Sequence, residues 1–441
     1  MQTRFLAYPL LCGLACAGEP VRGGSIPPGT FDQPSAGDNP GEVQPPPSGY
    51  RIPPSPALTP AEALETFRLP PGYRIEVVAS EPLIDTPVAI DFDPDGRIWV
   101  VEMRGYQNNP EGDNRLVPNG RIVVLEDTNA DGKMDKSTVY MDGLVLPRAV
   151  KVLADGVLIG EPPNVWFTRD TDGDLRADEK VSIANDYSVK EGSPSHAAAG
   201  LHWGMDNWVH NTTYSGQFRR IDGKWTKKTV PVLGDWGFGM DDFGRTYMNG
   251  SSGPLRVNLV ATGYQLRNPH IENAGGVYEV IAPPEELQVW PARPTPGVNR
   301  GYMKGSLRKN GTLTKFTAAA GLTIFRGDRL PAEIRGNHFI TEPAANLVRR
   351  SIVTEHADGR LSAANAYRNA EFLASTDERF RPVNLNTAPD GTLYVVDMYR
   401  GVLESHPFVT TFLKRQIYAV SYTHLRAHET KANLVCRLLL E

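Results

Sequence analysis

Residues 91–106 read DFDPDGRIWVVEMRGY, and residues 386–401 read NTAPDGTLYVVDMYRG. Aligned on their shared Pro-Asp-Gly, both stretches continue into four strand-forming residues, an acid and a methionine. Proline sets the φ angle of a turn, aspartate bonds back to the turn backbone, and glycine takes the position with positive φ. The residues that follow, Ile98 to Val101 and Leu393 to Val396, favour β-strands. The chain therefore repeats a strand–turn–strand unit near both ends of its folded part.

Related units lie between these two copies, at KVLADGVLIG (151–160), GLHWGMDNWVHNTTY (200–214), GFGMDDFGRTYMNG (237–250) and GNHFITEPAANLVRRSIV (336–353). At roughly 40–50 residues for each four-stranded blade, this length accommodates about six blades. We therefore predict an all-β fold, a six-bladed β-propeller over residues 59–420. A series of unrelated hairpins or a β-sandwich is the alternative. One short helix is expected near Thr59, which can cap its N-terminus ahead of Pro60 and Glu62.

The overall composition excludes some classes of function. The chain has 46 basic and 51 acidic residues and a net charge of −5, whereas a nucleic-acid binder would show a basic stripe. Its three cysteines, Cys12, Cys16 and Cys436, form neither a CxxC motif nor a CxxCH haem-attachment site. No apolar span long enough for a transmembrane helix follows the N-terminus. We therefore expect no nucleic-acid partner and no membrane-spanning segment in the folded part.

The N-terminal region predicts export. Residues 1–17 place Arg4 before a short apolar run, as in a signal peptide, and end in Ala15-Cys16-Ala17, a possible cleavage site. Alternatively, Leu14-Ala15-Cys16 resembles a lipobox whose cysteine is lipidated. Residues 18–58 are rich in proline and glycine, with 11 prolines between positions 19 and 56, which predicts a disordered linker. The expected location is the periplasm or the outer membrane of a bacterium, with a lipid anchor as the membrane contact.

Two acidic loops resemble cation sites. The sequence DTNADGKMD (127–135) and the sequence DTDGDLRAD (170–178) alternate oxygen-bearing side chains along tight turns. Such side chains converge on one point and suit Ca²⁺. The predicted ligands are Asp127, Asn129, Asp131 and Asp135 in the first loop and Asp170, Asp172, Asp174 and Asp178 in the second. Because both loops follow apolar strands, we expect them at blade edges with a structural role. Aspartate–glycine turns without metal are the alternative.

Propeller sites lie where loops converge near the axis, so polar residues in non-repetitive loops are the candidates. His196, in the small-residue loop EGSPSHAAAG, is a candidate base, although a lone histidine is more often structural. Arginines in similar loops could hold carboxylates through paired hydrogen bonds. The arginines in such loops are Arg267, Arg300, Arg379, Arg381 and Arg400. Exposed arginines without a ligand are the alternative for each.

A family resemblance sharpens these candidates. The stretches beginning LPPGYRIEVVASEPL and LPRAVKVLADGVLIG, the short motifs RNPH and GVNRGY, and the stretch STDERFRPVNLNTAPDGTLYVVDMYRG occur in one order. Together they resemble the membrane-bound dehydrogenase propeller of the PVC-type haem-binding CxxCH proteins, over about residues 69–418. That family is similar in turn to the glucose/sorbosone quinoprotein dehydrogenases. The resemblance implies a six-bladed propeller that uses pyrroloquinoline quinone and Ca²⁺.

The resemblance also implies roles for individual residues. SHAAAGLHWGMDNWVH resembles the stretch that carries the general base of the quinoproteins, at His196, and RNPH resembles their cofactor motif, at Arg267 and Asn268. His196 would then take a proton from a sugar or alcohol while hydride moves to the quinone. Arg300, Arg381 and Arg400 would join in holding the cofactor. A cytochrome c-type protein would accept the electrons. A non-catalytic propeller that binds a carbohydrate or a protein is the alternative.

The C-terminal sequence departs from this pattern. Residues 421–441, SYTHLRAHETKANLVCRLLLE, lack strand–turn units and resemble a translated sequencing adapter. We predict that this tail is non-native and that the chain is a fragment without the family's helical and cytochrome regions. His424, His428 and Cys436 are then expected to have no functional role.

Overall fold

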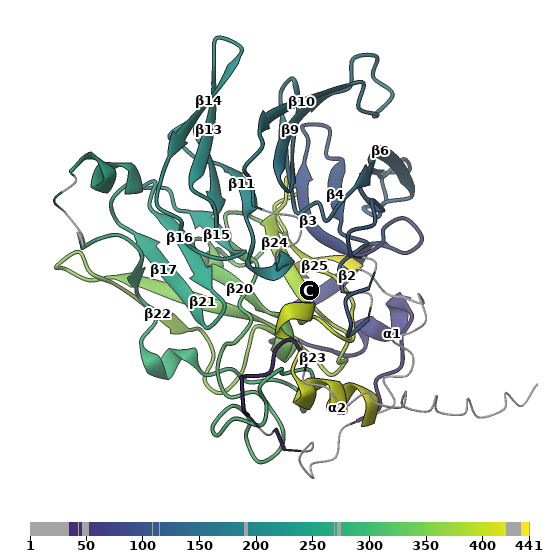
Figure 1. Cartoon of the computed structure of the whole chain (residues 1–441), viewed down its shortest axis with the longest axis vertical. Helices are drawn as coiled ribbons and strands as arrows, with labels where there is room; N and C mark the ends of the chain where they lie inside the picture. The colour runs from purple at the N-terminus through teal and green to yellow at the C-terminus, as the bar shows by residue number, and fades with distance from the viewer. Residues whose placement is uncertain are drawn as a thin grey trace, which may run out of the picture.

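The computed structural model contains six β-sheets arranged around one axis. Figure 1 shows the inner strands β3, β11, β15 and β24 near the middle of the molecule. The described residues are 35–42, 44–45, 53–107, 109–113, 115–188, 193–268, 270, 275–419 and 434–440. The signal peptide, the lipobox and residues 421–433 lie outside this set.

The first four sheets each consist of four consecutive antiparallel strands. Blade 1 contains β3 (Pro87–Phe92), β4 (Ile98–Glu102), β5 (Gly120–Glu126) and β6 (Lys136–Leu144). Blade 2 contains β7 (Ala149–Leu153), β8 (Gly156–Glu161), β9 (Asn164–Arg169) and β10 (Glu179–Ala184). Blade 3 contains β11 (Ala199–Trp203), β12 (Val209–Thr212), β13 (Gly216–Ile221) and β14 (Lys224–Thr229). Blade 4 contains β15 (Phe238–Met240), β16 (Thr246–Gly250), β17 (Gly253–Asn258) and β18 (Glu279–Val280).

The last two sheets use strands from both ends of the chain and close the ring. Blade 5 contains β19 (Leu322–Ile324), β20 (His338–Glu342), β21 (Leu347–Glu355), β22 (Leu361–Asn365), β23 (Leu373–Ser375) and β1 (Phe67–Arg68). Blade 6 contains β24 (Pro382–Thr387), β25 (Leu393–Asp397), β26 (Leu434–Leu440) and β2 (Tyr73–Ser80). Strand β24 lies against β3, so the last blade meets the first. The predicted six-bladed β-propeller is confirmed.

The two Pro-Asp-Gly stretches form equivalent turns between the innermost and second strands of blades 1 and 6. Gly96 and Gly391 have φ angles of 81° and 80°, values that favour glycine. Their backbone N–H groups donate to the carbonyls of Asp93 and Ala388, at 3.1 and 3.0 Å. The two copies of the motif therefore mark neighbouring blades at the point of ring closure.

The acid at the end of the same motif has a structural role that recurs around the ring. In five blades, a polar side chain at or near the end of the second strand accepts a backbone N–H from the loop leading into the innermost strand. These pairs are Glu102 with Asp85, Glu161 with Val145, Asn249 with Gly237, Glu342 with Ala318 and Asp397 with Arg381. The donor–acceptor distances lie between 2.7 and 3.0 Å. The device fixes the loops at one end of the propeller, where the axial cavity lies.

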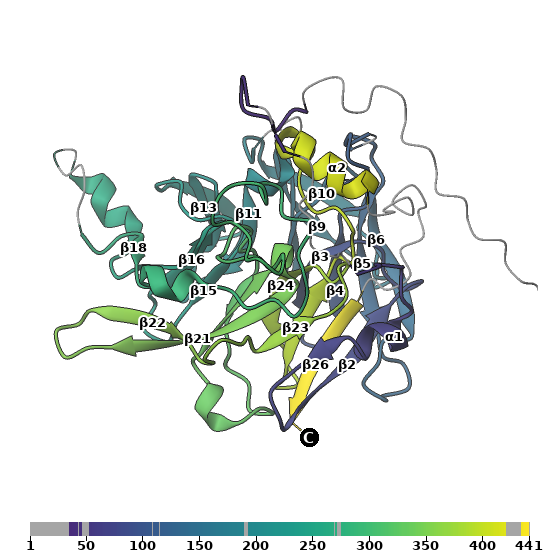
Figure 2. The ribbon, with the colours of Figure 1, turned by 90° about the horizontal axis from the view of Figure 1, so that it is seen from below.

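The short helices and the described parts of the predicted linker pack against the propeller. Helix α1 (Pro60–Leu64) has the predicted capping box of Thr59 and Glu62. The carboxylate of Asp38 accepts the backbone N–H of Thr411 at 2.7 Å, at the start of α2 (Thr411–Ala419). Figure 2 shows the purple N-terminal segment beside α2. Residues 35–42, 44–45 and 53–58 lie within the predicted linker and make hydrogen bonds to the rest of the chain, such as those of Asp38.

Part of the C-terminal tail also departs from expectation. Leu434–Leu440 form β26, which pairs with both β25 and β2 in blade 6. The apolar sequence of this segment explains the placement, because Val435 and Leu438 are fully buried between two other strands. The non-native origin of residues 421–441 stays a prediction from the sequence.

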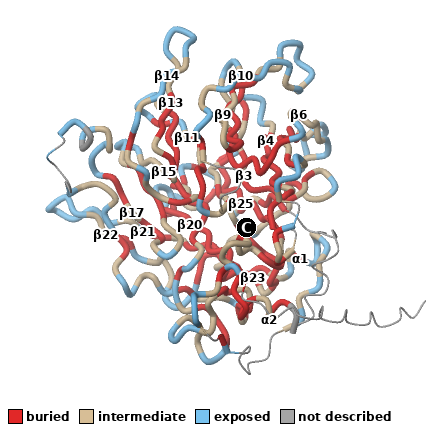
Figure 3. The backbone as a smooth tube through the Cα atoms, viewed as in Figure 1, coloured by how far each residue is buried: buried red, intermediate tan, exposed pale blue. Residues whose placement is uncertain are grey.

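The hydrophobic core consists of clusters between successive blades. One cluster joins Val101 and Val124 of blade 1 to Ile159 of blade 2, and another joins Tyr247 of blade 4 to Ile340 of blade 5. Figure 3 shows buried residues throughout the inner sheets and exposed tips on the β9–β10 and β13–β14 hairpins. Among the described residues, no helix is long and apolar enough to cross a membrane.

The buried acids of the second strands make stability depend on pH. Burial raises the pKa of Glu342 to about 8, from an ordinary value of 4.5. The folded state therefore binds this proton more tightly than the unfolded state, and the free energy of unfolding falls as pH rises from 4.5 to about 8. The slope from one such group reaches about 1.4 kcal/mol per pH unit.

We expect the Glu342→Gln variant to lose this contribution, because glutamine does not titrate. Urea unfolding of both proteins between pH 5 and pH 9 measures the effect. The wild-type free energy of unfolding should fall more steeply with pH than that of the variant. Parallel pH profiles would contradict the assignment.

Candidate functional site

An axial cavity of about 300 Å³ lies at the end of the propeller where the loops into the innermost strands converge. The loop before β11 contributes Ser195 and His196, and the loop before β15 contributes Asp235 and Trp236. The segment between β18 and β19 contributes Arg300, and the segment after β25 contributes Glu404 and Phe408. The cavity thus combines an imidazole, two carboxyl groups, a guanidinium and aromatic walls.

His196 lies where the sequence predicted a candidate base. It ends the 3-10 turn Pro194–His196, and its ring packs against Phe408 with centroids 4.7 Å apart. Its Nδ1 is hydrogen-bonded to Ser195 Oγ at 3.0 Å, which leaves Nε2 for a ligand. The indole of Trp236 donates to the Ser195 carbonyl at 3.0 Å. The loop is therefore held from the neighbouring blade.

Hydroxyl groups connect the His196 loop to the last blade. Ser405 Oγ donates to Ser195 Oγ at 2.8 Å, and Tyr106 OH lies 3.1 Å from Ser405 Oγ. Tyr106 OH also donates to the Leu403 carbonyl at 2.6 Å. These bonds join loops of blades 1, 3 and 6 across the axis and restrict the movement of the cavity wall.

Asp235, which the sequence did not single out, lines the same cavity as His196. Its Oδ2 accepts a hydrogen bond from Ser251 Oγ at 2.7 Å, and its buried Oδ1 has no hydrogen-bond partner. Burial raises the pKa of Asp235, while the charge of His196 opposes that rise. A positive charge on His196 therefore favours the ionised form of Asp235.

Glu404 is a second cavity carboxyl that the sequence did not single out. Burial raises its pKa to about 7, and the charge of Arg300 opposes the rise. Arg300 donates from Nη2 to the Gly37 carbonyl at 3.2 Å, so the N-terminal segment fixes one side of its guanidinium. The sequence predicted Arg300 as a cationic group of the site, and the structure places it in the cavity wall.

Arg381 lines the cavity, but its guanidinium donates its hydrogen bonds to other groups of the protein. Its Nε and Nη atoms donate to Glu378 Oε1 and to the carbonyls of Pro343, Arg400 and Gly401, at 2.7 to 3.0 Å. The side chain is buried together with Glu378. These donors hold three loops together, and the cofactor-binding role of Arg381 stays a prediction from the sequence.

Arg400 lies at the junction of the last and first blades and not among the cavity-lining residues. Its Nη2 donates to Thr86 Oγ1 at 2.8 Å. The adjacent Asp85 accepts from Arg104 Nε at 2.7 Å, and its pKa is lowered by Arg104 and Arg400 against the effect of burial. The two arginines that follow the repeated motifs thus meet at one loop. Arg400 therefore joins the last blade to the first, and its cofactor-binding role stays a prediction from the sequence.

Arg267 and Asn268 lie away from the cavity. Both are exposed, at the end of the 3-10 turn Thr262–Arg267 between β17 and β18. The Arg267 guanidinium lies 4.7 Å from the ring centre of Tyr264. The structure does not bring this pair together with His196, so the cofactor motif implied by the resemblance does not join the site.

The residues present do not fit the tricarboxylate quinone that the resemblance implies. Two carboxyl groups, Asp235 and Glu404, line the cavity, and the donors of Arg381 are bonded to the protein. Arg300 is the arginine of the predicted set that can still offer donors there. The quinone would bring its carboxylates close to the acids Asp235 and Glu404, and Arg300 alone would oppose the repulsion. Such binding is electrostatically unfavourable.

The two acidic loops lie on the outer hairpins of blades 1 and 2, as the sequence predicted. Asp127 accepts from the backbone N–H groups of Asp131 and Gly132, and Asp170 accepts from those of Gly173 and Leu175. The side-chain oxygens of Asp170, Asp172 and Asp174 lie within 4.8 Å of one another. The aspartate at the ninth position of each loop accepts a hydrogen bond from a threonine of the same loop. Asp135 accepts from Thr128, and Asp178 accepts from Thr171. The second loop therefore gathers carboxylates, and neither loop is among the elements that line the cavity of His196.

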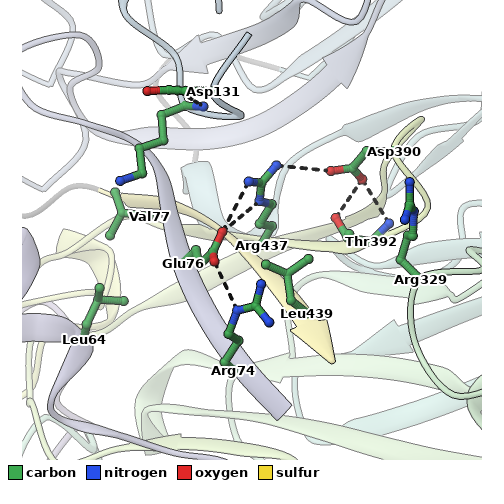
Figure 4. A pocket seen from close by; sticks show the side chains of 11 residues that line it. Leu64, Arg74, Glu76, Val77, Asp131, Arg329, Asp390, Thr392, Arg437 and Leu439 are labelled. Atoms are coloured by element: carbon green, nitrogen blue, oxygen red, sulfur yellow. Dashed lines mark hydrogen bonds and ion pairs between the residues drawn. The ribbon is translucent and has the colours of Figure 1, made fainter. Parts of the chain in front are cut away.

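A second pocket lies along blade 6, where β2 and β26 pair (Figure 4). Four of its charged side chains pair with each other. Arg437 bonds to Glu76 at 3.2 Å and lies 3.6 Å from Asp390, and Arg74 bonds to Glu76 at 3.1 Å. An ion-pair network of these four residues therefore forms one wall of the pocket at a blade edge.

Comparison with solved structures returns other propeller proteins. They include the pyranose dehydrogenase PQQ domain of Coprinopsis cinerea, at 13% identity and a TM-score of 0.49, covering 91% of this chain and 99% of that one. The soluble aldose sugar dehydrogenase of Escherichia coli matches at 12% identity and 0.41, covering 84% and 100%. Virginiamycin B lyase of Staphylococcus aureus matches at 13% and 0.39, with the same coverage. Because dehydrogenases and a lyase match alike, the likeness does not decide the chemistry.

Sequence comparison gives a family without an assigned activity. No curated protein matches the chain. The family model described as "Domain of unknown function (DUF7133)" matches residues 59–432, which include every described strand of the propeller except β26. The chain therefore belongs to the DUF7133 family.

Proposed function

We propose that the chain is an oxidoreductase that oxidises a hydroxyl group of a sugar or alcohol in the axial cavity. The observation that carries the proposal is the position of His196 and the buried Asp235 in the wall of the same cavity. A base supported by a carboxylate can take a proton from a hydroxyl that does not ionise in water. The sequence resemblance to the quinoprotein dehydrogenases supports this class of reaction. Because the cavity residues do not fit their tricarboxylate quinone, the proposal names no particular two-electron acceptor.

The proton moves to a defined atom. Nδ1 of His196 is engaged with Ser195, so Nε2 accepts the substrate's hydroxyl proton. The ionised Asp235 stabilises the imidazolium that forms, because opposite charges in a partly buried site attract strongly. The carbinol C–H then leaves as hydride to a two-electron acceptor, and a carbonyl group remains. Asp235 is thus a positioning and stabilising residue, and His196 is the base.

The shape of the cavity suits a small polyhydroxylated substrate. Its volume of about 300 Å³ is at the lower end of the usual range for ligand pockets. Tyr106, Trp236 and Phe408 provide apolar surfaces against which the C–H faces of a sugar can pack. The hydroxyls would find their partners among the carboxyl and guanidinium groups.

Reconstitution tests the proposal directly. The protein is mixed with pyrroloquinoline quinone with and without Ca²⁺, and dye reduction is followed across a panel of sugars and alcohols. Turnover with the quinone would support the full quinoprotein assignment. Turnover only with another two-electron acceptor would support the proposed oxidation and exclude pyrroloquinoline quinone as the cofactor. Absence of turnover under every condition would contradict the proposal.

The export and electron-transfer parts of the proposal need separate evidence. The sequence features in residues 1–17 support export to the periplasm, with or without a lipid on Cys16. A cytochrome c-type protein is the proposed final electron acceptor. Fractionation of cells that express the chain, followed by mass spectrometry of its N-terminus, tests both export and lipidation.

A carbohydrate-binding propeller without catalysis is the second candidate. The poor charge match between the cavity and the tricarboxylate quinone favours it. On this alternative, sugars bind in the axial cavity and no acceptor gives turnover.

Calcium binding by the two acidic loops is a further proposal, supported by the convergent carboxylates of Asp170, Asp172 and Asp174. We expect Ca²⁺ to raise the melting temperature, because a ligand that binds only the folded state stabilises it. The Asp170→Asn/Asp172→Asn variant should lose part of that rise. An equal rise with Mg²⁺, or none with Ca²⁺, would contradict a calcium-specific role.

A further inference from the structure

Two opposite charges face the axial cavity without meeting. Arg300 and Glu404 both line it, and the charge of Arg300 acts on Glu404. No direct ion pair joins these two described residues, whereas Arg349–Glu371 and Arg381–Glu378 pair at 2.5 and 2.8 Å. The structure records no hydrogen bond from a described residue to the Glu404 carboxylate. The two side chains can therefore still form hydrogen bonds with a ligand in the cavity.

Both side chains stand on loops that the fold holds in place. The Arg300 loop is tied to the chain after β25 through Asn299, which accepts from Thr410 N at 3.0 Å and donates to the Phe408 carbonyl. The Glu404 loop is tied through Tyr106, which donates to the Leu403 carbonyl. Gly37, whose carbonyl holds Arg300, packs so closely on Phe408 that a Cβ would lie 2.1 Å from the Phe408 carbonyl oxygen. These contacts hold in place the two loops that carry Arg300 and Glu404.

The chemistry of the pair selects the group that fits between them. A carboxylate accepts hydrogen bonds only, and a guanidinium donates only. A hydroxyl group does both, so it can donate to Glu404 and accept from Arg300. Neighbouring hydroxyls on one sugar ring can bond to His196, Glu404 and Arg300 at the same time. A simple alcohol has one hydroxyl, so when it binds at His196 it has none left for the other two residues.

We infer that the Arg300–Glu404 pair is a specificity site that selects an uncharged monosaccharide over simple alcohols and over sugar acids. Sugar acids are disfavoured because their carboxylate competes with Glu404 for the same guanidinium. The inference rests on the proposed function for the location of the substrate, and it concerns binding, so it does not require turnover.

Isothermal titration with glucose, glucuronate and 2-propanol tests the inference on the full chain, without a redox acceptor. Wild type should bind glucose more tightly than either other probe. Glu404→Gln should weaken glucose binding by about 10-fold or more, because hydrogen bonds to charged groups contribute about 1.5–3 kcal/mol. The same variant should bind glucuronate more tightly than wild type, because Arg300 then lacks a competing carboxylate. Arg300→Met should weaken the binding of both glucose and glucuronate.

Glu333→Gln, at an exposed position in another loop, is the matched control and should bind as wild type does. Melting temperatures establish that every variant is folded. Unchanged glucose affinity in Glu404→Gln, or no gain for glucuronate, would overturn the inference, as would failure of wild type to bind glucose. Glucose binding that depends on Glu404 without any turnover would support the inference while the proposed oxidation fails.

Discussion

Replacing His196 by glutamine is expected to lower kcat by about 10²–10⁴-fold, the usual contribution of a general base. Glutamine fills similar space and keeps a hydrogen-bonding group near Ser195, but it does not accept a proton at neutral pH. Ground-state binding depends on the aromatic walls and on Arg300 and Glu404, so KM should change much less than kcat. Initial rates with the best substrate of the reconstitution panel measure both constants.

His356→Gln provides the matched control. His356 is exposed on blade 5 and bonds to Ser362, so its replacement should leave both constants unchanged. If His196→Gln retains more than about one tenth of the wild-type kcat, the base lies elsewhere. Glu404, whose carboxyl shares the cavity, would then be the next group to test.

The architecture could be predicted because its signals are local. Each blade needs a tight turn followed by a strand, and the turns place glycine at positions such as Gly96 and Gly391, where φ is positive. Six such units along the chain were therefore enough to predict six blades. The acidic loops followed from equally local spacing, and the structure places both on outer hairpins.

The site was only partly predictable, because its members meet through the closure of the ring. His196 was recognised in its loop, whereas Asp235 and Glu404 were not, since neither belongs to a repeated motif. One signal was available, the position of Asp235 in the non-repetitive Gly-Asp-Trp-Gly stretch just before a strand. Nothing near Glu404 in the sequence shows that Arg300 will lie across the cavity from it.

The arginines show why residue type alone is a poor guide to a binding role. Arg267, Arg300, Arg381 and Arg400 were all predicted to hold a cofactor. Their roles depend on which carbonyls and carboxylates the fold brings near them. Arg300 keeps donors toward the cavity, Arg267 is exposed, and Arg400 joins blades 6 and 1. A guanidinium with its hydrogen bonds satisfied by the protein has a structural role.

Arg381 gives this distinction a measurable consequence. We expect the Arg381→Met variant to lose about 3–5 kcal/mol of unfolding free energy, the cost of removing one partner of a buried ion pair. Glu378 would keep only a backbone N–H from Gly297 at 3.3 Å and the guanidinium of Arg293 at 3.4 Å. The carbonyls of Pro343, Arg400 and Gly401 would lose their donors at the same time. Urea unfolding at neutral pH measures the loss.

Arg267→Met is the matched control, because the sequence assigned both arginines the same role and Arg267 is exposed. Its unfolding free energy should change by about 0.5 kcal/mol or less. The double variant Arg381→Met/Glu378→Gln should recover part of the loss, since it removes the unpaired buried charge together with its partner. If Arg381→Met is instead as stable as Arg267→Met and loses only affinity for a carboxylate ligand, then Arg381 binds a ligand and does not stabilise the propeller. The size of the stability change thus decides between the two roles, because a cofactor contact stabilises the folded chain only when the cofactor is bound.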